Sequence, residues 1–563
     1  MVTQSAVRRL PRVALWLFCL AYVLPGFIGR DPWRSQDIAA FGMMRELVAG
    51  NSSWWQLSWL GRGPDVPALL PYWLGAWSMQ IAPSWVAPDL AARIPFALLL
   101  GLTLLATWYA VYYLARRDAA QPVPFAFGGE AQPTDYARAM ADGALLAMIA
   151  MLGLAQLSHE TTPYAAQLAF TALLFYAFAA SAYRRAVPAA CAGIAAFGLA
   201  LSGVPAFGLA LACAGALARG MQKDTYARQW AVYFLALGIA AAVVAMQLGL
   251  WHAKVGQLPQ SMVDWSAWGK LMLWFTWPAW PMALVGLWKW RAWWRHLHIA
   301  LPLALASTII IATLIAPSAD RTLLLVAPTL ACLAAFALPT LQRSVTSLID
   351  WFTLVFFSGC GLIIWVVWIA METGIPAQPA ANVRRLVPGF EPSFGWLAFI
   401  AAFAATVAWV WLVMWRAGRH RDALWKSLVL PASGAAMSWL LLMSLWMPLL
   451  NYVRSDTALA QQVLQMTGIK STSVGAQCLA MQGVSQADTA AIEFHGRIKL
   501  QSLSSTSVCD WLVVSPDTRR DFLYSFSATT WQLAGSARRR TSTQDDLIIY
   551  RRSTSTVEQP AAQ

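Results

Sequence analysis

Apolar stretches of membrane-spanning length recur along almost the whole chain, and this feature constrains the fold more than any other. A helix needs about 20 apolar residues to cross a hydrocarbon core, and by that rule we count about thirteen such stretches. Of the 563 residues, 59% are hydrophobic and only 12% are charged, whereas a soluble domain has about a quarter charged residues. The sequence therefore predicts a mainly α-helical, polytopic membrane protein.

Clusters of Lys and Arg between these stretches predict the orientation of the chain. Cytoplasmic loops carry the Lys/Arg excess, and five clusters fall on one face, at residues 8–12, 116–117, 184–185, 289–295 and 416–426. We therefore expect a multi-pass protein of the inner (cytoplasmic) membrane with a cytoplasmic N-terminus. The net charge of +14 follows from this topology, so membrane lipids are expected partners and nucleic acid is not.

Two of the expected spans have unusual features. The third is placed at about 141–157 and the eighth at about 268–288. The eighth contains the Trp-rich run Leu273–Pro281, which is typical of an interfacial aromatic belt and a proline kink.

A change of composition after Asn451 indicates a separate domain. The runs Cys509–Ser515 and Asp546–Arg552 are typical of strands, and Asp456–Met466 is typical of a helix. We expect residues 1–450 to form the membrane domain, with an interfacial first periplasmic loop at 29–92, and residues 451–563 to form a small periplasmic α/β domain. In a periplasmic domain Cys478 and Cys509 can pair as a disulfide, although the sequence leaves the free thiols open.

Polar residues beside the expected spans on the outer face are the main candidates for chemistry, because a carboxylate at membrane level is costly. The first outer loop provides four of them and the second provides two: Asp31, Asp37, Glu46 and Asp65, then His159 and Glu160. We expect all six to meet at one interface. Structural roles stay open for five of them. Asp37 suits a helix cap, Glu160 suits a first helical turn, and His159 suits a hydrogen-bonded structural position at the interface. Asp65 suits a solvated turn, and Glu46 suits a local pair with Arg45.

The order of motifs resembles a known family. The first loop reads GRDPWRSQDIAAFGMMRELVAGNSSWW, in which Trp33, Asp37, Arg45, Glu46, Leu47 and Trp54 match, and Pro67, Pro71, Tyr72 and Trp73 follow. Downstream come SHETTPYAAQLAF (158–170), LSGVP (201–205) and DRTLLLVAPTLA (320–331). This pattern resembles the bacterial GT-C glycosyltransferases of the aminoarabinose-transferase and protein-mannosyltransferase-like group (GT39/GT83-type). Two departures are that the family's Asp-Glu pair aligns with Gln36 and Asp37, and that its motif lysines are absent.

The resemblance implies a function and a set of site residues. It implies transfer of a sugar from a polyprenyl-phosphate donor to a lipid A, glycan or protein acceptor at the periplasmic face, as in lipopolysaccharide modification or protein glycosylation. That reaction needs a carboxylate to deprotonate or orient the acceptor and a positive charge beside the leaving phosphate. The implied catalytic residues are Asp37 and Glu160, and the implied substrate-binding residues are Asp31, Asp65, His159, Arg321, Arg62 and Tyr72. Asp37 and Asp65 are also the candidates for holding a divalent metal ion.

Other interpretations stay open at this point. A transporter or flippase for polyprenyl lipids would usually show internal repeats and polar residues at mid-membrane depth, which this sequence does not. An inactive relative that acts in envelope assembly is compatible with Gln36 and with the missing lysines. For Arg321 the structural alternative is a local ion pair with Asp320.

Overall fold

The computed structural model describes residues 2–7, 10–123, 130–251, 256–417, 423–469, 478–503, 509–519, 530–539 and 546–553. The chain divides into two compact units. The first comprises Met1–Gly29, Val66–Val366 and Gly395–Trp446, and the second comprises Arg30–Asp65, Val367–Phe394 and Met447–Gln563. Most of the first outer loop and the segment from 367 to 394 thus belong to the same unit as the C-terminal part. The expected division had a single domain boundary after residue 450.

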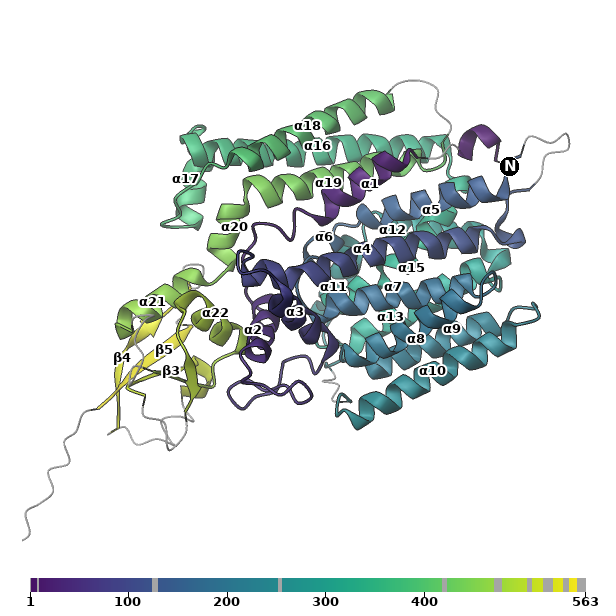
Figure 1. Cartoon of the computed structure of the whole chain (residues 1–563). Coiled ribbons are helices and arrows are strands. Elements are labelled where there is room, and N and C mark those ends of the chain that lie inside the picture. The colour runs from purple at the N-terminus through teal and green to yellow at the C-terminus, as the bar shows by residue number, and fades with distance from the viewer. Residues whose placement is uncertain are drawn as a thin grey trace, which may run out of the picture. The chain divides into compact units, whose positions relative to one another are not determined.

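The first unit is a bundle of helices, most of which run side by side in Figure 1. Its helices are α1 (Arg12–Val23), α3 (Leu70–Ile81), α4 (Pro88–Ala115), α5 (Pro133–Ile149), α6 (Leu154–Leu157), α7 (Pro163–Ala180), α8 (Ala186–Leu201), α9 (Pro205–Gly220), α10 (Ala227–Gln247), α11 (Met262–Phe275), α12 (Ala279–Lys289), α13 (Leu297–Ile315), α14 (Ala319–Leu323), α15 (Ala327–Ala337), α16 (Arg343–Thr373, to Val366), α18 (Trp396–Ala417) and α19 (Lys426–Leu445).

Many of these helices have the length and composition of membrane spans. Among the described residues, 8 helices are long and apolar enough to cross a membrane, or up to 9 if the bent pair α11 and α12 is one span. The helices α1, α8 and α9 are shorter but also apolar. The prediction of a mainly helical, multi-pass membrane protein is therefore confirmed.

Two of the expected spans differ in the structure from the ranges that the sequence suggested. Helix α5 occupies Pro133–Ile149 instead of 141–157, and it contains the buried Asp142, whose carboxylate accepts a hydrogen bond of 2.8 Å from Trp108 Nε1. The helix begins earlier than hydropathy indicates because its first two turns contain the polar residues Asp135 and Arg138, which an apolar window leaves out. Helices α11 and α12 are bent by 86° around Pro278, as expected of a residue that lacks an N–H donor.

Close approach of small residues holds the bundle together. In α7, 89% of the residues in the apolar stretch are buried. A Cβ atom on Gly198 would lie 2.5 Å from the Phe170 ring, and one on Gly215 would lie 2.2 Å from Phe178. Glycines therefore let the aromatic rings of α7 pack against α8 and α9, which is how helices associate without a hydrophobic driving force between them.

The second unit contains a small mixed sheet. Its elements are α2 (Gln36–Val48), α17 (Ala377–Leu386), α20 (Met447–Arg454), α21 (Thr457–Thr467), β1 (Leu479–Gln482), α22 (Gln486–Gly496), β2 (Leu500–Ser502), β3 (Trp511–Val514), β4 (Trp531–Ala537) and β5 (Leu547–Arg552). The strand order is β2-β1-β3-β5-β4, with β1 parallel to β2 and β3, and β5 antiparallel to β3 and β4. The predicted helix after Asp456 and both predicted strands are confirmed.

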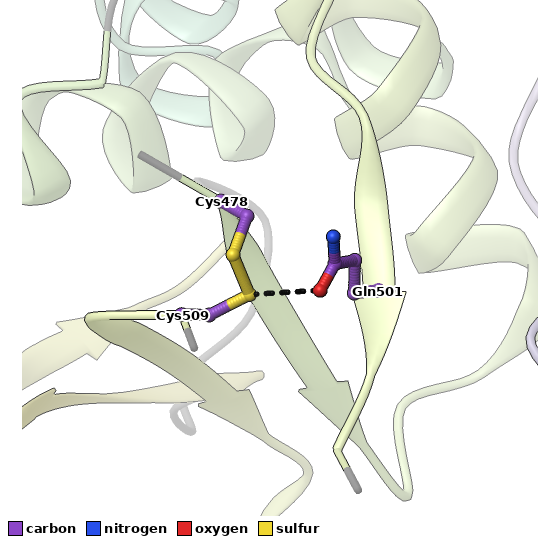
Figure 2. Close-up of a disulfide and its surroundings, with 3 residues drawn as sticks. All are labelled: Cys478, Gln501 and Cys509. Atoms are coloured by element: carbon purple, nitrogen blue, oxygen red, sulfur yellow. Dashed lines mark hydrogen bonds between the residues drawn. A yellow bond between two sulfur atoms is a disulfide. The ribbon is translucent and has the colours of Figure 1, made fainter. Parts of the chain in front are cut away.

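A disulfide links two neighbouring strands of this sheet (Figure 2). Cys478 and Cys509 are 31 positions apart, and their Cα atoms are separated by 4.9 Å. Cys478 directly precedes β1, and Cys509 lies two positions before the start of β3. Gln501 Oε1 lies 3.3 Å from the sulfur of Cys509. The structure thus decides the open question about these two cysteines in favour of the bridge.

Removal of this bridge should destabilise the sheet. The double substitution Cys478→Ala with Cys509→Ala is expected to lower the free energy of unfolding of the C-terminal domain by about 2–4 kcal/mol, because the bridge restricts the unfolded chain. Pulse proteolysis of the full-length protein in urea, followed through the C-terminal fragment, measures this change. Cys213→Ala, at an exposed cysteine of α9, is the matched control, and equal urea midpoints for the two variants would contradict the expectation.

Candidate active site

An ion pair joins two segments of the first unit that the sequence singled out. Glu160 lies in the turn between α6 and α7, and Arg321 lies on α14. Arg321 Nη1 donates a hydrogen bond of 2.7 Å to Glu160 Oε2, and the two side chains are only 11% and 6% exposed. The structure therefore pairs Arg321 with an acid 161 positions away rather than with its neighbour Asp320.

The guanidinium of Arg321 keeps donors for a further acceptor. It has five N–H donors, and Glu160 is its one hydrogen-bond partner among the residues that the structure describes. Its carbon also lies 5.6 Å from the centre of the Tyr164 ring, a distance at which a cation and an aromatic face attract each other. A phosphate oxygen could accept from the remaining donors while the ion pair with Glu160 stays intact.

His159 has the surroundings of a structural residue. The side chain is fully buried, with Nε2 at 3.0 Å from the carbonyl oxygen of Tyr22 and Nδ1 at 3.2 Å from Ser158 Oγ. The ring also contacts Phe27 and Trp439, with 4.9 Å between ring centres in each case. These contacts fasten the turn before Glu160 to α1 and α19, so the geometry favours the structural alternative for His159.

A second buried pair, in the second unit, involves Asp37. Its carboxylate accepts hydrogen bonds from Arg30 Nη2 and, at 3.1 Å, from the backbone N–H of Trp33. The Arg30 and Asp37 side chains are at most 1% exposed. The centre of the Trp33 ring lies near two guanidinium groups, 4.5 Å from that of Arg30 and 5.1 Å from that of Arg454. Asp37 thus stabilises the first turn of α2, as its position near the helix N-terminus favours.

Sequence reasoning missed Arg30. The signal was present, because Arg30 is a single basic residue at the end of an apolar stretch, seven positions before an acid. A charged residue at such a place needs a nearby partner of opposite sign, and Asp37 provides it.

The remaining candidates are held by backbone contacts. In the second unit, the Asp31 N–H donates to Asn451 Oδ1, Arg62 Nη1 donates to the carbonyl of Val484, and the Asp65 N–H donates to Gln486 Oε1, each at 3.1 Å. In the first unit, the hydroxyl of Tyr72 donates to the carbonyl of Val66 at 3.2 Å. These contacts fix loop positions, and the predicted roles of the four residues in substrate binding stay predictions.

The expected metal site lacks support from geometry. The carboxylate of Asp37 is buried and engaged by a guanidinium, whereas Asp65 is exposed. In the part of the chain that the structure describes, no three His, Cys, Asp or Glu side chains are grouped so as to hold a metal ion. The residues named for the metal therefore do not fit a divalent cation, and we assign no step to one.

A buried acid on α2 and a partly buried acid on α22 were not expected to come together. Glu46 is 8% exposed, and Glu493 on α22 is 15% exposed with Oε1 at 3.9 Å from Arg45 Nη1. Burial, together with the negative charge of Glu46, raises the pKa of Glu493 to about 7, although Arg45, Lys499 and a hydrogen bond from Trp59 oppose the shift. The sequence could not show this contact, because it depends on how α22 packs.

The packing of α2 against α22 should therefore weaken as pH rises. The pKa of Glu493 is raised from 4.5 to about 7 in the folded protein, so folding disfavours its ionised form and the loss of stability develops as pH rises from about 4.5 through about 7. Hydrogen exchange of α22 amides, corrected for the intrinsic pH dependence of exchange, is expected to show stronger protection at pH 5 than at pH 8. Glu493→Gln should remove this difference, and an unchanged difference in that variant would contradict the assignment.

The sequence and the structure were compared with known proteins, and the result concerns the class of fold. No family model and no curated protein matches the sequence. Among solved structures, however, the chain matches two structures of one protein over nearly the whole length of both chains, and this likeness confirms the expected fold.

Both of these structures are of ArnT from Cupriavidus metallidurans. The apo structure is 14% identical, covers 96% of this chain and 98% of its own, and has a TM-score of 0.59. The structure bound to undecaprenyl phosphate is 13% identical, covers 97% of this chain and 99% of its own, and has a TM-score of 0.61. At this identity the comparison establishes the fold, and the narrower GT39/GT83-type group stays a prediction.

Proposed function

We propose that the protein is an integral-membrane glycosyltransferase that uses a polyprenyl-phosphate sugar as donor. The observation that carries this proposal is the similarity of fold, over nearly the whole of both chains, to an ArnT structure bound to undecaprenyl phosphate. The ion pair of Glu160 with Arg321 supports it, because it places a guanidinium with unused donors among apolar helices. A long isoprenoid lipid with a phosphate head matches that combination of surroundings.

The proposed reaction exchanges one bond at the sugar for another. The bond between the anomeric carbon and the phosphate oxygen breaks, the acceptor oxygen bonds to that carbon, and polyprenyl phosphate leaves. Arg321 stabilises the charge that develops on the leaving phosphate, and Glu160 positions Arg321 through their hydrogen bond. The acceptor proton passes to a carboxylate.

The acceptor is proposed to be lipid A, another glycan or a protein on the periplasmic side of the inner membrane. The disulfide between Cys478 and Cys509 supports this side for the C-terminal domain, because such bonds persist in oxidising compartments. The Lys/Arg clusters predict the opposite, cytoplasmic side for the N-terminus.

Purified protein tests the proposal through transfer and binding. Transfer of labelled sugar from a panel of polyprenyl-phosphate monosaccharides to extracted envelope lipid, glycan or protein measures activity, and radiolabelled undecaprenyl phosphate measures binding. Arg321→Gln is expected to lower kcat by about 10²- to 10³-fold, as for loss of one donor to a charged transition state. Glu160→Gln should lower kcat about tenfold or more, because Arg321 would lose the hydrogen bond that positions its guanidinium.

The matched control is Arg384→Gln, at an exposed arginine of α17, which should keep wild-type kcat. Asp37→Asn tests the carboxylate that Arg30 holds, with thermal unfolding measured in parallel to separate activity from folding. Absence of undecaprenyl phosphate binding, or equal turnover in all four variants, would remove these residues from the proposed mechanism.

A further inference from the structure

A cluster of basic side chains in the first unit is not used by the proposed reaction. Arg219, in the last turn of α9, is fully buried and binds Asp224 through both Nη atoms at 2.7 Å each. Its Nε also donates to Ser181 Oγ at 3.0 Å. Both oxygens of the Asp224 carboxylate are thus engaged by one guanidinium.

Arg117, just after the end of α4, is one of those other cations. Its Nη2 lies 3.7 Å from Asp224 Oδ2, beyond hydrogen-bond distance. Its Nη1 is buried, with no hydrogen-bond partner among the described residues. Burial lowers the pKa of Arg117, and the charge of Arg219 acts in the same direction, while Asp224 and Tyr183 oppose it. Arg117 and Arg219 thus share the single carboxylate of Asp224, so this pair of arginines keeps a net positive charge.

Tyrosine rings hold two further guanidinium groups in the cluster. Arg116 lies over the rings of Tyr112 and Tyr183, at 5.6 and 5.3 Å, and Arg185 lies over the ring of Tyr226 at 4.1 Å. Such stacking orders an arginine without using its N–H donors. These two side chains are therefore oriented but still able to bind an anion.

The position of the cluster in the fold suggests which anion is available. The arginines lie where α4, α7 and α9 end and where α8 and α10 begin, and several of these helices have the length and apolarity of membrane spans. Ends of spans lie at the depth of lipid headgroups. This end of the bundle also carries the Lys/Arg excess that predicts the cytoplasmic face.

We propose that Arg116, Arg117 and Arg185 bind the phosphodiester headgroup of an anionic phospholipid in the leaflet on this face. The N–H donors of the two ring-bound arginines, Arg116 and Arg185, supply charge-assisted hydrogen bonds to the phosphate oxygens, and Arg117 adds positive charge beside them. Basic sites between helix ends on this side of a membrane are suited to such headgroups. The site does not depend on the proposed glycosyltransferase activity.

Native mass spectrometry of the full-length protein tests the site. Protein released from detergent with added dioleoylphosphatidylglycerol is expected to retain this lipid in preference to dioleoylphosphatidylcholine. Arg117→Gln should lower the retained fraction of the anionic lipid about fivefold, consistent with the contribution of one basic side chain near a lipid surface. Arg185→Gln, at an exposed residue, should lower it similarly and does not disturb buried packing.

Arg291→Gln is the matched control, because Arg291 carries the same charge, lies on the same predicted face and is stacked over Trp288 at 4.6 Å. It should leave retention unchanged. An equal decrease in this control would show a general effect of charge and overturn the proposal, as would equal retention of both lipids by the wild type. Binding of inorganic phosphate that is lost in Arg117→Gln, without any preference for the anionic lipid, would instead reveal a site for free phosphate and also overturn it.

Discussion

A charge in a medium of low dielectric constant must be compensated by a partner, and this requirement shapes the protein more than any other. The described helices of the bundle contain few charged side chains, and several of these are paired across helices, as in Arg416 with Asp350 and Arg321 with Glu160. Breaking one partner of a buried pair leaves an uncompensated charge, which costs several kcal/mol. The pairs therefore fix which helices are neighbours, and they place the reactive groups of the proposed site.

The same requirement applies in the second unit. Arg539, at the end of β4, forms ion pairs with three carboxylates, those of Asp456, Asp488 and Asp546. One guanidinium thereby connects the start of α21, the start of α22 and the residue before β5. A planar group with five donors can do this, whereas a lysine could not satisfy the same geometry. The small domain is organised around this residue as much as around its apolar core.

The sequence was most informative where one strong local signal dominates. Long apolar runs, the strands at Trp511–Val514 and Leu547–Arg552, and the kink at Pro278 all follow from local composition. The sequence was less informative where packing between distant segments determines which side chains meet. The partner of Arg321 is 161 positions away, and Glu493 meets Glu46 only because α22 packs on α2. Hydropathy also missed the start of α5, because Asp135 and Arg138 lie in its first two turns.

The bridge between Cys478 and Cys509 also makes maturation depend on where the tail resides. It joins the starts of two adjacent strands in the middle region of the sheet, so the linked form of the domain requires thiol oxidation after synthesis. A tail that stays in a reducing compartment keeps two free thiols. A tail that reaches an oxidising compartment forms the disulfide. The redox state of these two sulfurs thus shows whether the tail has been translocated. Gel mobility after thiol labelling separates the oxidised form from the reduced form.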